Sequence, residues 1–452
     1  MGKYFGTDGV RGVANVELTP QLAYDLGRAG AYVLKKHSQH RSMKTKVIIG
    51  TDTRLSKDLL MMSLAAGAMS IGADVIDIGV VPTPAVAYLT RIHRADAGVV
   101  ISASHNPMEY NGIKFFNSKG LKLDDSIESE IEGFLDDMQK IPNVVSHEEL
   151  GKTLRLDDYV DEYISFLTKF QNVDLTGLNI TLDCANGAAY KIAPQVFNAL
   201  GAKTFVINNE PDGININLNA GSTYLEPLSQ AVLKNHSDVG LAYDGDADRL
   251  LAIDEKGDPV DGDRLMLIFA KYLKTINALR DNKLVVTVMS NLGLHIAAKE
   301  LGIGVEVTAV GDRYILEKML EKDYSIGGEQ SGHMIFLDHN TTGDGILSSL
   351  ILAKILKESG KKLSELAEIM DIYPQVLINA EVKNEKKLEY KTNALIQAEI
   401  KKLEEKMSGK GRVLIRHSGT EPLVRVMLEG QDLEEITIYA RELSDLIERI
   451  LG

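Results

Sequence analysis

The stretch DAGVVISASHNPMEYNGIKFF, residues 96–116, joins a hydrophobic run to a polar loop. The β-branched run 97–101 predicts a buried strand. The polar run 102–107, which ends at Asn106-Pro107, predicts a turn at the carboxyl end of that strand. Because ligands bind at this edge of open α/β sheets, Ser104 is a candidate nucleophile, with His105 and Lys114 close by. The alternative is a serine that only caps the turn.

The order strand–helix–strand surrounds this stretch and recurs along the chain. Strands are expected at 47–49 and 75–78 and helices at 57–70 and 84–92, so the region predicts a largely parallel sheet covered by helices. The same order recurs over 179–243 and again over 264–326. After Pro374 the pattern changes to that of a smaller unit with strands near 376–382 and 412–428 and helices at 394–407 and 433–451. The prediction is three similar α/β units with mainly parallel mixed sheets plus a C-terminal α+β domain, with domains at 1–155, 156–256, 257–372 and 373–452.

Composition restricts the classes of partner. The 452 residues carry 50 Lys plus Arg against 64 Asp plus Glu, a net charge of −14. This acidity disfavours nucleic acid and favours a small phosphorylated ligand held by a local cationic pocket. The single cysteine, Cys184, excludes an intrachain disulfide and a Cys-based zinc site. No apolar signal core begins the chain and the longest mostly apolar run, 59–73, is too short to span a bilayer, so a cytoplasmic protein without a membrane partner is expected.

Three alternating aspartates, Asp244, Asp246 and Asp248, follow the predicted strand 239–243. In an extended segment their carboxylates project from one face, where they repel one another unless a cation lies between them. An all-oxygen set suits Mg²⁺ or Ca²⁺ rather than zinc. An EF-hand is disfavoured because Arg249 occupies the position that needs glycine and the flanks are predicted strands. A metal-free acidic loop is the other alternative.

Two further loops carry polar side chains suited to a sugar phosphate. Glu329, Ser331 and His333 lie on one short segment, which suits recognition of sugar hydroxyls, although Glu329 and His333 can instead pair with each other. The segment from Arg416 to Glu421 combines guanidinium, hydroxyl and glycine N–H groups, which are the parts of a phosphate pocket. Its members are Arg416, Ser418, Gly419, Thr420 and, on the following strand, Arg425.

Together the four loops contain the groups needed for phosphoryl transfer onto a sugar phosphate. There is no G-x-S-x-G elbow around Ser104, no G-x-x-x-x-G-K-[ST] and no G-x-G-x-x-G after a strand. Serine hydrolases, P-loop kinases and dinucleotide enzymes are therefore disfavoured.

The motifs, in this order, resemble those of the α-D-phosphohexomutases. The opening residues Tyr4–Gly12, YFGTDGVRG, and residues 340–345, NTTGDG, are similar to the phosphoglucosamine mutase branch of that family. The motifs that carry the family resemblance are SASHNP at 102–107, DGDADR at 244–249, GEQSGH at 328–333 and RHSGTE at 416–421. Two positions depart from the family pattern: Ala247 stands where glycine is usual, and His417 where proline or alanine is usual.

The resemblance implies four domains around a central cleft and assigns a role to each loop. Ser104 would be carried as phosphoserine, and one Mg²⁺ would be held by the three aspartates and a phosphoserine oxygen. Glu329 and Ser331 would contact the sugar. The non-reacting phosphate would be held by Arg416, Ser418, Gly419, Thr420 and Arg425.

The implied reaction interconverts glucosamine 6-phosphate and glucosamine 1-phosphate through a sugar 1,6-bisphosphate, a step toward UDP-N-acetylglucosamine. Lys114 is the preferred general base and His333 the second choice, and a lysine fits this role only if its surroundings lower its pKa. Phosphomannomutase or phosphoglucomutase activity, a non-catalytic metal or sugar-phosphate sensor, and a hydrolase are the alternatives. The family suggests a homodimer.

Overall fold

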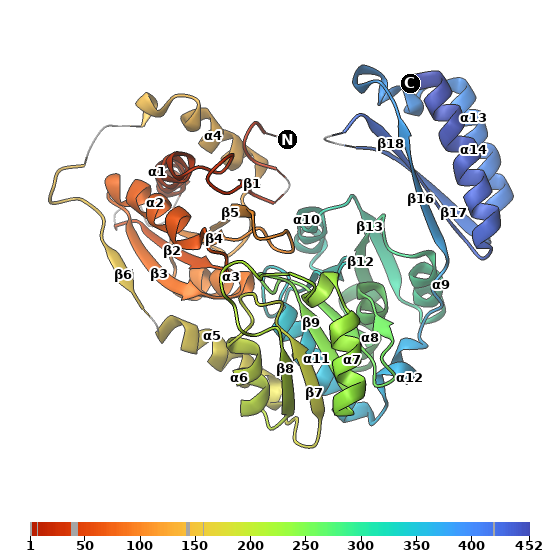
Figure 1. Ribbon diagram of the computed structural model, residues 1–452, viewed down its shortest axis with the longest axis horizontal. Helices are drawn as coiled ribbons and strands as arrows, with labels where there is room; N and C mark the ends of the chain where they lie inside the picture. The colour runs from red at the N-terminus through yellow and green to blue at the C-terminus, as the bar shows by residue number, and fades with distance from the viewer. Residues whose placement is uncertain (1, 7, 38–43, 142–144, 157, 419–420) are drawn as a thin grey trace. The chain divides into compact units, whose positions relative to one another are not determined.

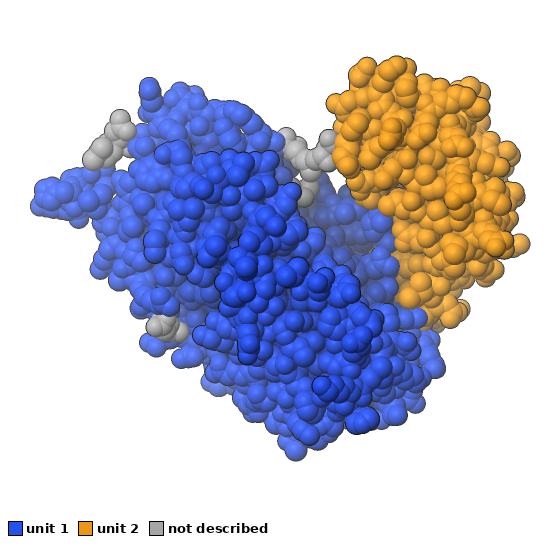
Figure 2. All heavy atoms as spheres, viewed as in Figure 1, with its two compact units in different colours: residues 1–289, 303–369 blue, residues 290–302, 370–452 orange. Residues whose placement is uncertain are grey.

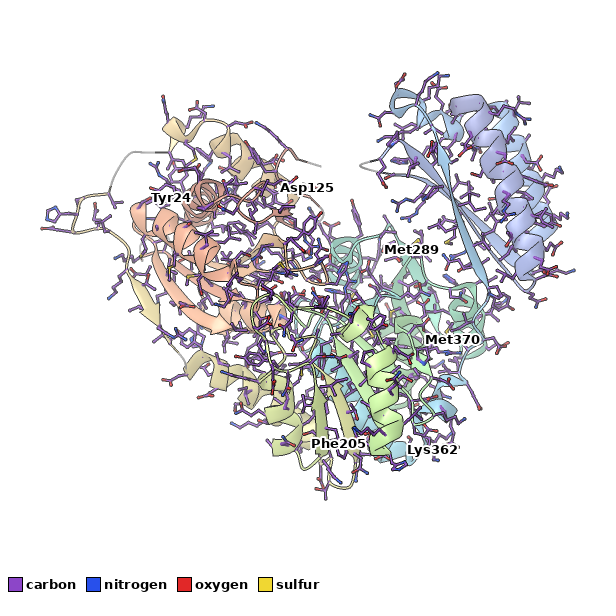
Figure 3. All side chains as sticks on the ribbon, viewed as in Figure 1. Tyr24, Asp125, Phe205, Met289, Lys362 and Met370 are labelled. Carbon is purple, nitrogen blue, oxygen red and sulfur yellow. The ribbon has the colours of Figure 1, made fainter. Side chains whose placement is uncertain are left out.

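The computed structural model describes all residues except 1, 7, 38–43, 142–144, 157 and 419–420. It divides into two compact units, residues 1–289 with 303–369 and residues 290–302 with 370–452 (Figure 2). The chain leaves the first unit after Met289 and enters the second again at Met370, both of which are labelled in Figure 3. None of the helices in the described part of the chain is long and apolar enough to cross a membrane.

The first sheet of unit 1 has the strand order β1-β5-β4-β2-β3-β6. Strands β2, β3 and β4 pair in parallel, as the alternating pattern predicts, whereas β5 returns antiparallel to β4. Every residue of β4 is buried, so the strand before Ser104 is confirmed as a core strand. Bounds are β1 Val10–Val13, α1 Pro20–His37, β2 Lys46–Thr51, α2 Lys57–Ser70, β3 Asp74–Val80, α3 Thr83–Ile92, β4 Ala97–Ile101, β5 Tyr110–Asn117, α4 Asp125–Leu135 and β6 Thr153–Arg155.

The second and third sheets of unit 1 are also mixed. Their orders are β11-β10-β9-β7-β8 and β13-β12-β14-β15, with parallel pairs joined to antiparallel strands at one edge. The predicted fold class is therefore confirmed. Bounds are α5 Asp158–Thr168, β7 Asn179–Asp183, α6 Ile192–Ala199, β8 Lys203–Ile207, α7 Glu226–Asn235, β9 Val239–Tyr243, β10 Leu250–Ile253, β11 Pro259–Val260, α8 Gly262–Thr275, β12 Lys283–Thr287, β13 Gly304–Thr308, α10 Asp312–Lys322, β14 Ile326–Gly328, β15 Met334–Phe336, α11 Gly345–Ser359 and α12 Leu363–Ala367.

Unit 2 is the expected smaller α+β domain, with helix α9 added to it. Its antiparallel sheet has the order β16-β18-β17, and helices α13 and α14 cover one face of it (Figure 1). The core between sheet and helices includes Val424, Val426, Leu443 and Ile447. Bounds are α9 Leu292–Glu300, β16 Gln375–Glu381, α13 Ala394–Met407, β17 Gly411–His417, β18 Leu423–Gly430 and α14 Leu433–Leu451.

A buried carboxylate fixes the start of helix α11 in unit 1. Asp344 is 1% exposed and caps the helix by accepting from the Leu347 N–H at 3.0 Å. It also accepts from the Tyr163 hydroxyl at 3.0 Å and the Asn340 amide at 3.1 Å. Burial raises the pKa of Asp344 to about 6, although these hydrogen bonds oppose the shift. The ionised cap therefore costs stability relative to a neutral one.

We expect Asp344→Asn to remove a pH dependence of unfolding. Because the folded pKa lies above the unfolded value, the wild type loses stability as pH rises from about 4 through 6, a loss of about 1–2 kcal/mol between pH 5 and pH 8. Asparagine keeps the capping oxygen and cannot ionise. Urea unfolding of both proteins across this range measures the free energy of unfolding. This free energy should rise for the variant relative to the wild type as the pH increases. If the free energies of unfolding of the two proteins changed equally with pH, ionisation of Asp344 would not be the cause of the pH dependence.

Candidate active site

The predicted nucleophile lies at the carboxyl end of β4, against the aspartate loop. Ser104 is 1% exposed, and its Oγ donates to Asp244 Oδ2 at 2.6 Å across 140 residues of sequence. The ring Nδ1 of His105 lies 3.3 Å from the same Oγ. Ser104 has φ +52°, a left-handed conformation that costs a non-glycine residue about 1 kcal/mol or more. The surrounding structure thus holds the hydroxyl in a strained position facing the carboxylates.

A buried arginine shapes the nucleophile loop. Arg54 is fully buried, and its Nη2 donates to the carbonyls of Ser104 at 3.0 Å and Asn106 at 2.8 Å. Its charge is balanced by Asp52 at 2.9 Å, which in turn accepts from the Ser102 hydroxyl at 2.6 Å. The sequence analysis did not predict roles for Arg54 and Asp52. The signal that could have found them is the polar run 51–54 at the end of the predicted strand 47–49, on the same sheet edge as Ser104.

The three aspartates form one buried cluster, called here the acid cluster: Asp244, Asp246 and Asp248. One ligand atom from each lies within 4.8 Å of the others. Burial, together with the charges of Asp248 and Asp246, raises the pKa of Asp244 well above its ordinary value. Two buried oxygens, Asp246 Oδ1 and Asp248 Oδ1, have no hydrogen-bond partner among the described residues. Orphaned oxygens in a repelling all-carboxylate set are what Mg²⁺ would satisfy, so the residues fit the metal that the resemblance implies.

We expect Asp248→Asn to weaken Mg²⁺ binding by more than the roughly 10-fold to 100-fold that loss of an outer-shell partner costs. The substitution removes one charge from the ligand set while keeping the side-chain shape. Asp254→Asn is the matched control, because Asp254 is buried and only ten residues away from Asp244, but accepts from the N–H groups of Lys256 and Asp258 in a turn. Calorimetric titration with MgCl₂ measures both. Equal affinities would return the loop to its metal-free interpretation.

Lys114 lies beside the acid cluster, but its surroundings do not meet the condition set for its role as a base, which is a lowered pKa. Its ammonium is 2.9 Å from Asp246 Oδ2 and 3.1 Å from Asp8 Oδ2. Burial alone would lower its pKa, yet Asp246, Asp8 and Asp248 outweigh burial and raise it. The lowered pKa required of a resident general base is therefore not found. The physical reason is that the lysine is buried among carboxylates rather than among apolar groups or cations.

The loop between β14 and β15 brings the predicted sugar-binding residues beside the same cluster. Ser331 Oγ is 3.4 Å from Glu329 Oε2, and both side chains are half-buried. His333 is buried with Nδ1 3.5 Å from Asp248 Oδ2, and it pairs across a β-bridge with Arg249. Burial lowers the His333 pKa, but Asp248, Asp312 and Glu329 raise it to about 9 overall. His105 shows the reverse, because partial burial and the charges of Arg249 and Arg11 lower its pKa to about 4.

The predicted phosphate loop belongs to unit 2. Arg416 of β17 and Arg425 of β18 are directly opposite each other in the antiparallel pair. Burial and the Arg425 charge lower the pKa of Arg416, as expected for like charges at adjacent positions. Ser418 is buried beside them and donates toward Glu421 at 3.4 Å. Gly419 and Thr420 lie outside the described residues. Arg425 Nη2 also donates to Glu421 Oε2 at 2.9 Å. Two arginines at opposed positions favour a bound anion.

The two departures from the family pattern have structural consequences. Ala247 is buried with φ +54°, so it occupies a left-handed position where glycine carries no Cβ penalty. His417 has its pKa lowered by burial and by Lys391, Lys387 and Arg416, which makes it a neutral addition to the cationic loop. Cys184 is buried, as expected for a small apolar residue.

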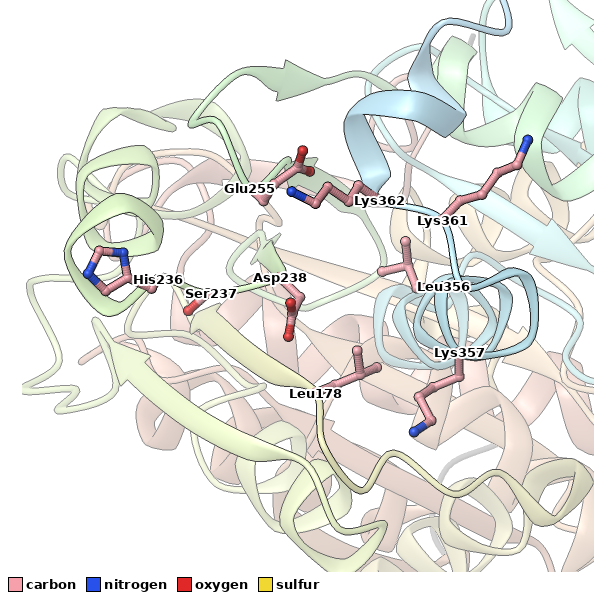
Figure 4. Close-up of a pocket in the computed structure, with 10 residues that line it drawn as sticks. Leu178, His236, Ser237, Asp238, Glu255, Leu356, Lys357, Lys361 and Lys362 are labelled. Atoms are coloured by element: carbon pink, nitrogen blue, oxygen red, sulfur yellow. The ribbon is translucent and has the colours of Figure 1, made fainter.

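A separate cavity of about 530 Å³ lies at the amino ends of β7 and β9 (Figure 4). The acid cluster follows the opposite, carboxyl end of β9. Two of the cavity's polar side chains already have partners: Glu255 accepts from the Ser364 hydroxyl at 2.6 Å and Lys357 donates to the Thr176 carbonyl at 2.6 Å. Lys362 points toward Glu255, whereas Lys361 points away from it. This arrangement gives no convergent set of donors, and we assign the active site to the acid cluster.

Comparison with known proteins agrees with this arrangement along the whole chain. Four models of the phosphoglucomutase/phosphomannomutase family match: α/β/α domain I at residues 2–141, domain II at 157–257, domain III at 261–373 and the C-terminal domain at 377–446. The chain is 60% identical to a phosphoglucosamine mutase of Caldicellulosiruptor bescii and 58% identical to one of Clostridioides difficile, each over 100% of both chains.

Solved structures share the fold. A phosphoglucomutase/phosphomannomutase family protein from Burkholderia thailandensis has a TM-score of 0.83 at 23% identity and covers 100% of this chain and 99% of its own. The Aspergillus fumigatus N-acetylphosphoglucosamine mutase, solved with GlcNAc-6P and magnesium, has a TM-score of 0.70 at 17% identity, covering 99% and 96%. Because four family models match consecutive segments of the chain in order, and full-length relatives are near 60% identical, the chain belongs to the phosphoglucomutase/phosphomannomutase family.

Proposed function

We propose that the chain is a phosphoglucosamine mutase, an isomerase that interconverts glucosamine 6-phosphate and glucosamine 1-phosphate. The observation that carries the proposal is the buried Ser104 hydroxyl 2.6 Å from Asp244 in the acid cluster. A hydroxyl beside a divalent-cation site is suited to phosphoryl transfer. The full-length relatives at 58–60% identity favour the amino sugar over glucose or mannose phosphates.

In this mechanism Ser104 works as phosphoserine. A free sugar hydroxyl attacks its phosphorus, the Ser Oγ–P bond breaks, and a sugar bisphosphate forms. The bisphosphate then reorients in the site and transfers its other phosphoryl group back to Ser104, which completes the isomerisation. Asp244, Asp246 and Asp248, with an oxygen of the phosphoserine, would hold Mg²⁺, which would offset the charge of the transferring group.

Proton exchange accompanies each transfer, since the attacking hydroxyl loses a proton and the leaving oxygen gains one. Lys114 and His333 stay our proposed groups, and both carry a proton in the surroundings described here. In each transfer one of them would donate its proton to the leaving oxygen. The proton lost by the attacking hydroxyl in that transfer would pass, through an oxygen of the transferring phosphoryl group, to the donor that has become neutral. The neutral His105 beside Ser104 Oγ would orient that oxygen.

Binding groups would hold the sugar and the distal phosphate. Glu329 and Ser331 would contact sugar hydroxyls, and Arg416, Ser418, Gly419, Thr420 and Arg425 would hold the phosphate that is not reacting. Domains 1–155, 156–256, 257–372 and 373–452 would then contribute one loop each. A cytoplasmic location and a homodimer are further parts of the proposal.

The test is a mutase assay on purified protein with glucosamine 6-phosphate, with and without Mg²⁺, while free phosphate is measured. We expect Mg²⁺-dependent formation of glucosamine 1-phosphate, dependence on a trace of sugar 1,6-bisphosphate, and phosphate on Ser104 by peptide mapping. Faster isomerisation of glucose or mannose phosphates would reassign the substrate. Stoichiometric release of free phosphate would indicate a hydrolase, and ligand binding without turnover a sensor.

A further inference from the structure

The opening motif Tyr4–Gly12 has no role in the mechanism above, yet it places a carboxylate in the active site. Asp8 Oδ2 lies 3.1 Å from the Lys114 ammonium, and Asp8 Oδ1 accepts from Lys122 Nζ at 2.5 Å. Arg11 contacts the same carboxylate. The three cations hold the pKa of Asp8 well below its ordinary value in spite of burial, so the group is ionised. Asp8 is therefore a negative charge shared by the buried Lys114 and the half-buried Lys122.

The segment that carries Asp8 is held firmly against β5. Strand β1 pairs with β5 in the register Val10↔Ile113, one residue before Lys114. Gly9 has φ +77°, and a Cβ there would lie 2.4 Å from the Ile113 carbonyl oxygen, so only glycine permits this approach. The side chain of Glu132 on α4 accepts from the N–H groups of Tyr4 and Phe5 at 2.6 and 2.7 Å. The position of Asp8 is thus set by contacts other than its own.

Asp8 differs from the other carboxylates on Lys114. Three carboxylates in the described part of the chain form ion pairs with its ammonium, at 2.9 Å (Asp246), 3.1 Å (Asp8) and 3.9 Å (Asp248). Asp246 and Asp248 belong to the acid cluster, whose oxygens would be shared with a bound cation. Asp8 is the one outside the cluster, so its hold on the lysine does not depend on what the cluster binds.

The same carboxylate connects to the sugar loop through Lys122. Lys122 Nζ lies 2.6 Å from Asp312 Oδ2 at the start of α10, and Asp312 Oδ2 lies 3.4 Å from His333 Nε2. Asp8 thus contacts Lys114 directly and is linked to His333 through the ion pairs with Lys122 and Asp312. Lys114 and His333 are the two side chains that exchange protons in the proposed mechanism. These contacts are buried or half-buried and poorly screened by solvent.

We propose that Asp8 is a positioning residue that holds the Lys114 ammonium against the acid cluster. The proposal rests on the proposed function insofar as it predicts a catalytic effect. Without the Asp8 charge, Lys114 keeps only partners that a metal ion also attracts, and its ammonium moves away from the reacting oxygens. Partners of this kind typically contribute roughly 10-fold to 100-fold to turnover.

The experiment compares Asp8→Asn with Glu132→Gln in kinetics, thermal unfolding and crystal structures. We expect Asp8→Asn to lower kcat roughly 10-fold to 100-fold with KM within about threefold. Glu132→Gln loosens the same segment without touching Lys114, and should lower Tm while keeping kcat. In crystals of Asp8→Asn grown with Mg²⁺ the Lys114 ammonium should be displaced from Asp246, compared with wild-type crystals grown in the same way. Asp8→Glu, which keeps the charge, replaces Asp8→Asn if that variant does not fold, and should cause a smaller displacement and a smaller loss.

A double variant shows whether Asp8 acts through Lys114. In a Lys114→Met background the added Asp8→Asn change should have little further effect on kcat, because the group it positions is gone. Additive losses, an unmoved Lys114 in the Asp8→Asn crystal, or equal kcat losses in Asp8→Asn and Glu132→Gln would each overturn the proposal. The crystallographic comparison needs no turnover, so a wild type inactive on glucosamine phosphates would refute the proposed function and leave the positioning inference to be decided by the structure.

Discussion

Ser104→Ala is expected to lower mutase turnover on the order of 10⁴-fold or more, because no side-chain oxygen remains to carry the phosphoryl group. The fold should survive. Alanine meets the same left-handed backbone conformation that serine already adopts, and the lost hydrogen bond to the Asp244 carboxylate is worth about 1.5–3 kcal/mol. A coupled assay for glucosamine 1-phosphate measures turnover, and intact mass shows whether phosphate is still attached.

The control for this variant is Ser63→Ala. Ser63 lies on α2, and its hydroxyl donates to the Leu59 carbonyl within the same helix. The Ser63→Ala variant should retain wild-type turnover and the mass of a phosphorylated chain. Substantial isomerisation by Ser104→Ala at wild-type Mg²⁺ would disprove the phosphoserine mechanism and leave the acid cluster as the starting point for another one.

Arg54→Met is expected to have the largest effect on stability, on the order of 3–5 kcal/mol. The substitution leaves Asp52 as an uncompensated buried charge and removes the Arg54 donor from three carbonyls, those of Ser104, Asn106 and Pro107. Asn217 Nδ2 still donates to the first two, at 2.9 and 3.1 Å. Turnover should fall as well, since these carbonyls shape the nucleophile loop. Urea unfolding followed by fluorescence, together with the mutase assay, measures both effects.

The double variant Asp52→Asn with Arg54→Met separates charge from shape. Removing both charges avoids the unpaired carboxylate, so the double variant should be more stable than Arg54→Met alone. Its turnover should stay low, because the loop carbonyls still lack the donor that Arg54 supplied. Recovery of both stability and turnover would mean that the Arg54 contacts to the loop do not shape the nucleophile.

Much of the fold could be predicted because local pattern carries it. The strands at 97–101 and 239–243 and the helices at 57–70, 394–407 and 433–451 end where the sequence indicates. Helix α11 was not predicted, because 11 of its 15 residues are buried and a helix buried on most sides has no polar face to mark its period.

Part of the candidate site could likewise be predicted from local sequence, and part could not. The sequence by itself predicted which loops carry the candidate groups, since Ser104, the acid cluster and the sugar loop each follow a predicted strand, and carboxyl ends of strands are where ligands bind in open α/β sheets. Only the tertiary structure decided which charges meet there. Lys114 contacts Asp246 across 132 residues and Asp8 across more than a hundred, and these partners reverse the pKa shift that burial alone would cause. Charge interactions depend on distance through the fold rather than on spacing along the chain, so the roles of Asp8, Arg54 and the charged Lys114 required the folded structure.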